Sequence, residues 1–296
     1  MDICGIEESV IPYRKEESMS IVTFWSPYQR SGTTSNMISV AYMIGLSQRL
    51  RSLVMHMDYA GESCELGMPI RETNTDFLMD HLSTTGWDAM FRLYSSGSLT
   101  KEKFRDCTIP LLKNQLDLLP GKYRLPFLGE RDIGTKQISS ISKITNEAYD
   151  LVLLDAGSGQ RLERDILKDS DVVVINLNQN MREIEHFFID TKWKQDLEQK
   201  KIIITLGLYD RDSNCTPTNI KRRFGYRDPI LPIPYCSPFR DAWNRRDVGT
   251  YIHQTMNLDK KSGEMGELAT NIRELSKIIM ESAGLRSILK QLERGA

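Results

Sequence analysis

The sequence at residues 21–34 is IVTFWSPYQRSGTT. It joins a β-rich apolar run, Ile21–Trp25, to a turn-rich segment, Ser26–Thr34, and a helical pattern follows over 34–50. In such a strand–loop–helix unit, the backbone N–H groups of the loop and the positive end of the helix dipole converge on one point. The stretch therefore predicts a phosphate-binding loop (P-loop) in an α/β fold, with the hydroxyl of Thr34 placed to bind Mg²⁺.

This loop departs from the usual pattern G-x-x-x-x-G-K-[ST]. Pro27 replaces the first glycine and Thr33 replaces the lysine, whereas Gly32 keeps the second glycine. The missing lysine normally contacts the β- and γ-phosphates as a point charge. Arg30 is the one cation of the loop, and two interpretations stay open: it supplies charge to a phosphate, or it points into solvent. Taken alone, the stretch also fits an ordinary Ser/Thr-capped turn between a strand and a helix.

Two other apolar strands end in aspartates that suit a magnesium site. Asp58 follows the run Leu53–Met57, and Asp155 follows Leu151–Leu154 and precedes the small-residue stretch AGSG, 156–159. A carboxylate at such a strand end reaches Mg²⁺ through water, beside a loop that senses the γ-phosphate. The alternatives are that Asp58 only caps the next turn, and that Asp155 belongs to an ordinary buried strand followed by a turn.

Short apolar runs alternate with helical patterns along the chain, which is typical of a mostly parallel sheet. We expect a three-layer α/β/α sandwich with a doubly wound sheet: a single domain over 19–296 with a C-terminal helix, after an N-terminal extension over 1–18. The predicted strands are Ile21–Trp25, Leu53–Met57, Leu116–Leu119, Leu151–Leu154, Val172–Leu177, Ile202–Leu206 and Ile230–Ile233. The predicted helices cover 34–50, Thr75–Leu82, Gly86–Tyr94, 133–148, 160–168, 181–198, 217–224, 238–246 and a tail from Gly266 to Arg294 that breaks near Gly284.

Composition narrows the class of protein. The net charge of -1 argues against a generally basic surface that coats nucleic acid. The five cysteines include no CxxC pair, so neither a zinc site nor a disulfide framework is expected, and the four histidines show no metal-ligand spacing. With no secretory leader and no run of about 18 apolar residues, we expect a cytoplasmic protein whose membrane attachment, if any, is peripheral.

The order of these segments resembles that of the ParA/MinD family of P-loop ATPases, whose loop has the pattern K-G-G-x-G-K-[ST]-T. Aligned through Gly32, the additional lysine of the family falls on Tyr28, and its two glycines fall on Gln29 and Arg30. Both lysines of the pattern are therefore absent. Asp169–Leu177 is similar to the strand that follows the second aspartate in the family.

The resemblance implies ATP or ADP with Mg²⁺ as the cofactor. Gly207 stands where the family often has an asparagine that contacts adenine, so the preferred base stays open. The residues implied to bind nucleotide are Ser31, Gly32, Thr33, Thr34, Ser35, Asp210 and Pro234. Those implied to bind the metal are Thr34, Asp58 and Asp155. Those implied to act in catalysis are Asp58 and, as a substitute for the lysine, Arg30.

The stretch Leu116–Gly121 resembles a feature of the TadZ/CpaE branch, whose members position pilus-assembly machinery and often have atypical loops. This resemblance implies a nucleotide-binding scaffold or positioning factor with weak or no ATP hydrolysis. Losing one contact that strengthens in the transition state costs about 3–4 kcal/mol, which is a hundredfold to a thousandfold in rate. Two alternatives are a genuine slow ATPase that uses Arg30 or a partner's residue, and an interaction module that binds no nucleotide.

The family resemblance also implies a homodimer and protein partners in a pilus, secretion or positioning system. Because Tyr28 replaces the lysine that crosses between subunits, we do not expect nucleotide to switch dimerisation. The tail over 285–294 has one apolar face with cations beside it, which fits either peripheral attachment at the inner face of the membrane or a helix packed on the sheet. For the basic cluster Lys221–Arg223, a solvated helix face is favoured over DNA binding.

Overall fold

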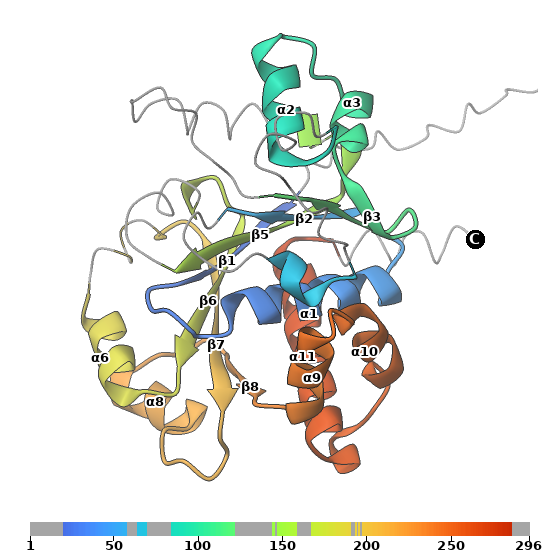
Figure 1. The fold of residues 1–296 in the computed structure, drawn as a ribbon. Coiled ribbons are helices and arrows are strands. Elements are labelled where there is room, and N and C mark those ends of the chain that lie inside the picture. Colours follow the sequence, from blue (N-terminus) through green and yellow to red (C-terminus); the bar gives the residue numbers. More distant parts are fainter. Residues whose placement is uncertain are drawn as a thin grey trace, which may run out of the picture.

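A computed structural model of the chain describes residues 20–57, 64–69, 84–121, 144, 145, 147–158, 167–190, 193, 195 and 197–285. Within these residues, eight strands form one sheet in the order β3-β4-β2-β5-β1-β6-β7-β8 (Figure 1). Neighbouring strands are parallel except for the β3–β4 pair, which is antiparallel. The described residues contain no helix long and apolar enough to span a membrane.

The elements follow the predicted alternation of strands and helices. The strands are β1 (Ser20–Ser26), β2 (Ser52–His56), β3 (Ile109–Leu112), β4 (Leu116–Leu119), β5 (Leu151–Ser158), β6 (Val172–Asn178), β7 (Lys201–Tyr209) and β8 (Ile230–Pro234). The helices are α1 (Thr33–Ser47), α2 (Gly86–Ser95), α3 (Lys101–Asp106), α6 (Met181–Ile189), α8 (Pro217–Phe224), α9 (Ser237–Asn244), α10 (Val248–Thr255) and α11 (Gly263–Ser282), with short 3-10 turns at Cys64–Gly67 and Lys260–Ser262.

Both faces of the sheet are apolar because consecutive strand residues point to opposite sides. In β1, Val22 and Phe24 join the core formed with α1, α10 and α11, whereas Ile21 and Trp25 face the other side. On that other side, α2 and α3 cover the β2–β5 half of the sheet, while α6 and α8 cover the β6–β7 half (Figure 1). The predicted doubly wound α/β sandwich is therefore confirmed.

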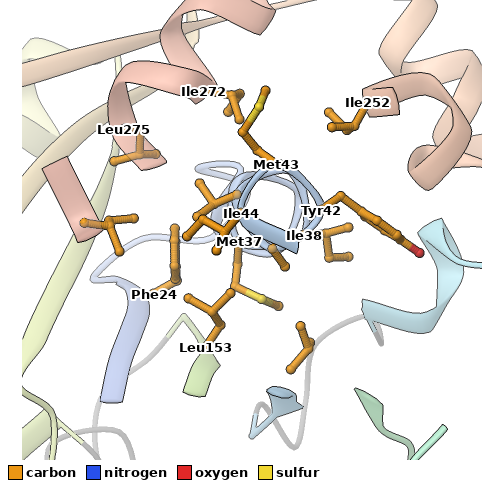
Figure 2. Close-up of a cluster of buried hydrophobic side chains, with 14 of the residues drawn as sticks. Phe24, Met37, Ile38, Tyr42, Met43, Ile44, Leu153, Ile252, Ile272 and Leu275 are labelled. Carbon is orange, nitrogen blue, oxygen red and sulfur yellow. The ribbon is translucent and has the colours of Figure 1, made fainter. Parts of the chain in front are cut away.

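Helix α1 lies at the centre of the largest core. Figure 2 shows it end-on, with Phe24 and Leu153 of the sheet on one side and Ile252 and Ile272 of the covering helices on the other. It is buried nearly all around, including the residues Met37, Ile38, Tyr42, Met43 and Ile44. Burial of this kind holds the start of α1, and with it the end of the preceding loop, in a fixed place against the sheet.

All seven predicted strands are present, with ends that differ by a few residues, but several other predictions were wrong or incomplete. Strand β3 was missed because it is short, half exposed and contains Pro110, which weakens a strand signal. The helix predicted over 181–198 is not continuous: α6 ends at Ile189, since the backbone of Asp190 is extended. Helix α10 was missed because VGTYIHQT is rich in Gly and β-branched residues, and its packing on α1 overrides that preference.

The C-terminal helix begins earlier than predicted, and it ends close to the predicted break near Gly284. Helix α11 begins at Gly263 and ends at Ser282, where Ala283 is its C-cap. The tail beyond Leu285, the helix predicted at Thr75–Leu82, and most of those predicted at 133–148 and 160–168 lie outside the described residues.

Candidate functional site

The loop after β1 leads into the N-terminus of α1. Gly32 is the N-cap and has φ 80, a left-handed conformation that glycine adopts without strain. The first N–H groups of any α-helix have no intrahelical acceptor, so those of Thr33, Thr34 and Ser35 are available to an anion. The side chain of Ser35 turns back and donates to the Gly32 carbonyl oxygen at 3.0 Å. The helix terminus therefore offers backbone donors, and Thr34, which is half-buried, adds a hydroxyl beside them.

Thr33, which stands in place of the P-loop lysine, is turned into the protein. Its Oγ1 lies 3.0 Å from the Oγ of Ser31, and both side chains are buried. Ser31 in turn donates to the carbonyl oxygen of Tyr28 at 3.3 Å. These contacts close the loop on itself, so the hydroxyls of Ser31 and Thr33 are bonded within the loop and neither residue offers a charged side chain to a ligand.

The first half of the loop is tied to β6 and α6. Tyr28, at the position of the family's additional lysine, donates its hydroxyl to the Glu183 carbonyl oxygen at 3.0 Å, and this hydroxyl also lies 3.0 Å from His186 Nδ1. Partial burial and the nearby Glu183 carboxylate raise the pKa of Tyr28. Asn178 donates to the Gln29 carbonyl oxygen at 3.3 Å. Tyr28 is thus engaged within its own chain.

Arg30 lies at the tip of the loop. Its side chain is exposed, and its φ of 61 is uncommon for a residue other than glycine. Aligned through Gly32, the ParA/MinD pattern has a glycine at this position, and glycine is the residue that adopts a left-handed backbone without strain.

The end of β7 packs directly on the loop at Gly207. A Cβ atom at this position would lie 2.1 Å from the Ser31 carbonyl oxygen and 3.0 Å from the Ser31 carbonyl carbon. Contacts this short to backbone atoms are not tolerated, so the position excludes every side chain. Close packing of β7 against Ser31 therefore explains why this position is a glycine.

A buried network of polar side chains lies under the first turn of α1. Asn36 Nδ2 and Thr205 Oγ1 both donate to Asn176 Oδ1 at 2.8 Å, and all three side chains are buried. Asn176 Nδ2 lies within hydrogen-bond distance of the carbonyl oxygens of Trp25 (3.4 Å) and Val174 (3.2 Å). The network joins α1 to β1, β6 and β7. Sequence reasoning missed it, although an asparagine inside the apolar run VVVINLN was a usable signal.

On the other side of β1, Asp155 is held by a histidine that was not predicted to take part. Asp155 Oδ2 lies 3.1 Å from His56 Nδ1, and Asp155 Oδ1 accepts the Gly157 N–H at 3.0 Å. The side chain of Asp155 is 0% exposed, and that of His56 is 1% exposed. The predicted Asp58 lies outside the described residues, but the chain just before it is fixed, since Met57 N–H donates to the Asp155 carbonyl oxygen at 2.8 Å.

The two residues predicted near the base lie at the same edge of the sheet. Tyr209, just before Asp210, pairs with Pro234 at the ends of β7 and β8. Asp210 is exposed, and its backbone N–H and C=O are both bonded to the side-chain amide of Gln179 at 2.8 Å. Its Oδ1 accepts the Asp212 N–H at 2.9 Å. The observed role of the Asp210 carboxylate is to stabilise this turn.

These groups lie at the carboxyl ends of central parallel strands, where ligands of α/β proteins bind. The backbone donors of α1 suit phosphate, and the hydroxyl and carboxylate oxygens of Thr34 and Asp155 are of the kind that Mg²⁺ prefers. Among the described residues, no group of three or more His, Cys, Asp or Glu side chains could hold a metal ion by itself. A magnesium ion bound through one or two carboxylates, water and phosphate fits this set, because Mg²⁺ rarely uses an all-protein cage.

No family model and no curated protein sequence matches the chain. Among solved structures, a ParA family ATPase from Chlorobium tepidum TLS matches with a TM-score of 0.66 at 15% identity, over 88% of this chain and 99% of that one. MinD from Pyrococcus horikoshii OT3, complexed with Mg-ADP, matches with a TM-score of 0.64 at 15% identity, over 90% of this chain and 98% of that one. The MinC:MinD cell division complex from Aquifex aeolicus matches with a TM-score of 0.62 at 13% identity, over 88% of this chain and 96% of that one. The chain has the α/β P-loop NTPase fold of ParA/MinD ATPases.

Proposed function

We propose that this chain is an atypical ParA/MinD-like nucleotide-binding protein that acts as a scaffold or positioning factor, with weak or no ATP hydrolysis. One observation carries the proposal: the residue in place of the P-loop lysine, Thr33, is buried and paired with Ser31 at 3.0 Å, beside a helix N-terminus that keeps its backbone donors. The part of the site that binds phosphate through the backbone is retained, and the part that adds a side-chain charge is absent.

For nucleotide binding, the N–H groups of Thr33, Thr34 and Ser35 would face the phosphates, with Gly32 allowing the loop its left-handed turn. The hydroxyl of Thr34 and the carboxylate of Asp155 would hold Mg²⁺, with Asp58 as a further carboxylate. When bound, Mg²⁺ neutralises charge on the phosphate oxygens. The MinD neighbour is a Mg-ADP complex, which supports ATP or ADP with Mg²⁺ as the ligand class.

Weak turnover follows from the charges that the site lacks. Without the lysine, the backbone donors bind ground-state and transition-state phosphates about equally, and uniform binding does not raise the rate of the chemical step. The loss is on the order of a hundredfold to a thousandfold, from the usual effect of removing one charge-stabilising donor. Tyr28 does not replace this charge, since its hydroxyl is bonded to α6 of its own chain.

The cellular role is proposed from the family resemblance. We place the chain near the TadZ/CpaE branch on the stretch Leu116–Gly121, and we propose a homodimer that binds protein partners of a pilus, secretion or positioning system in the cytoplasm. The match to a MinC:MinD complex supports protein partners in general. Attachment of the C-terminal tail to the inner face of the membrane is part of this proposal, whereas DNA binding through Lys221–Arg223 is not favoured.

A second candidate, a genuine slow ATPase, is favoured by the exposure of Arg30 at the loop tip. A multiple-turnover ATPase assay separates the two. The scaffold proposal predicts a rate at least about a hundredfold below that of an ordinary ParA protein. A comparable rate that vanishes in Asp58→Ala would contradict it, and a slow rate abolished by Arg30→Ala would establish the slow ATPase instead.

A further inference from the structure

His56 makes a buried contact with Asp155 that none of the motifs account for. We propose that His56 is a positioning residue for the metal site: its Nδ1–H holds Asp155 Oδ2 and so fixes the orientation in which this carboxylate is presented to Mg²⁺. The inference rests on the proposed nucleotide-binding function and deepens it.

The contact follows from the parallel register of two adjacent strands. His56 is the last residue of β2 and pairs with Asp155 of β5 across the sheet, so the two side chains emerge side by side. The Nδ1–Oδ2 distance is 3.1 Å, and on the other side Oδ1 accepts the Gly157 N–H at 3.0 Å. With one donor on each oxygen, rotation of the Asp155 carboxylate would break at least one buried hydrogen bond.

The remaining nitrogen of His56 argues that packing alone does not account for an imidazole at this position. Its Nε2 is buried and has no hydrogen-bond partner among the described residues. A buried polar atom without a partner is unfavourable, and a leucine would fill a similar volume without that loss. Since Nε2 has no partner among the described residues, the histidine is best explained by what its Nδ1 does, which is to hold Asp155.

The carboxylate keeps capacity for a further partner. An ionised carboxylate has about four lone-pair sites, and the two observed donors use two of them. Asp155 also pairs with Phe24 of β1, the strand that leads into the phosphate loop, so it lies beside the element that would carry the nucleotide. Partners that orient a metal ligand typically change metal affinity about 10- to 100-fold when they are removed.

Two variants of His56 form a matched pair. In His56→Asn the amide nitrogen lies close to the position of Nδ1, so a donor to Asp155 is kept. In His56→Gln the donor lies one bond further along the side chain, away from Asp155. Both substitutions are polar and neutral, and they differ mainly in whether the positioning contact is retained.

The measurement is the affinity of each protein for a fluorescent ADP analogue, once with excess Mg²⁺ and once with EDTA. The proposal predicts that His56→Gln loses about 10- to 100-fold of the magnesium-dependent gain in affinity, with binding in EDTA unchanged within about twofold. His56→Asn should keep a gain within about threefold of that of the unmodified chain. Equal losses in both buffers, or equal behaviour of the two variants, would overturn the proposal.

A second measurement needs no nucleotide. In EDTA, a double-mutant cycle between His56→Gln and Asp155→Ala should show that the two substitutions together destabilise the chain less than the sum of their separate effects, because each alone leaves a buried partner unsatisfied. Additive effects would contradict the contact. If the unmodified chain binds the ADP analogue in neither buffer, both the proposed nucleotide-binding function and this inference fail. If the unmodified chain binds the analogue but the two His56 variants do not differ, only this inference fails.

Discussion

The phosphate loop follows β1, and Asp155 lies near the end of the neighbouring strand β5. The polar side chains of these two regions make different kinds of contact. In the loop, Tyr28 and Ser31 direct their hydroxyls to other parts of the chain, and Thr33 is paired with Ser31. At the strand end, the carboxylate of Asp155 is held in place by His56 and a backbone N–H, and among the described residues no lysine or arginine pairs with it. The hydroxyls of the loop are therefore used in contacts within the chain, whereas the carboxylate of Asp155 is the group that we propose binds a metal.

This difference shows which parts of the site depend on side chains and which depend on the fold. The left-handed turn at Gly32 and the donors at the start of α1 come from the backbone, and they are present although the loop contains no lysine. Three further substitutions, each with a control, test the contacts around the loop and the start of α1, and they are considered in order of expected effect.

Gly207→Val should have the largest effect, because the new side chain collides with the backbone of the loop. A Cβ would lie 2.1 Å from the Ser31 carbonyl oxygen, so β7 and the loop must separate. We expect a loss of about 3 kcal/mol in the free energy of unfolding, measured by urea denaturation. The control is Gly225→Ala, where φ is 64 but nothing lies within 4 Å of the added atom. The Gly225→Ala variant should lose about 1 kcal/mol of unfolding free energy from backbone strain alone. Equal losses in the two variants would show that β7 does not pack on the loop.

Asn176→Leu should be the next most damaging change, since it leaves Asn36 and Thr205 without their shared acceptor in a buried site. The expected loss is about 2 kcal/mol in the free energy of unfolding. Asn178→Leu, two residues along the same strand and half-buried, serves as the control. Water can replace its hydrogen bonds, so it should lose less than about 1 kcal/mol. A reversed order would mean that the network does not hold α1 to the sheet.

Tyr28→Phe tests the tie between the loop and α6 with a smaller effect. Removing the hydroxyl that donates to the Glu183 carbonyl oxygen should cost about 1 kcal/mol in unfolding free energy at neutral pH. Tyr235→Phe, at an exposed tyrosine, should cost close to nothing.

The same variant has a pH dependence that can be checked. The pKa of Tyr28 is raised in the folded protein from its ordinary value of 10.0. The neutral phenol therefore contributes its full stability below about pH 10, and this contribution is lost as the pH rises through the raised value. The stability difference between Tyr28→Phe and the unmodified chain should shrink in alkaline urea titrations. A difference that grows above pH 10 would contradict the assigned direction.

Much of the fold could be predicted from the sequence because its strands are continuous apolar runs with turn residues at their ends. The run before Asp155 and the strand–loop–helix unit at 21–34 are local signals, so the sequence alone indicated the two sides of the candidate site. Strand β3 could not be predicted in the same way, since its pairing with β4 is a tertiary contact and Pro110 obscures its local preference.

The contacts that define the site were not local and could not be found by spacing alone. His56 and Asp155 are 99 positions apart and meet only because β2 and β5 are adjacent. Gly207 could be identified as a departure from the family pattern, but the reason for it is the approach of Ser31, which only the folded chain shows. The isolated polar residues within apolar strands, His56 and Asn176, were the signals that deserved a functional interpretation.

The central claim is that the chain still binds magnesium nucleotide although its loop lacks the lysine. Isothermal titration of Mg-ATP and Mg-ADP into the unmodified chain and into Asp155→Asn tests this most directly. The account predicts saturable binding to the unmodified chain and an affinity for Mg-ATP at least about tenfold lower in Asp155→Asn. The absence of binding to the unmodified chain, or an unchanged affinity in Asp155→Asn, would contradict it.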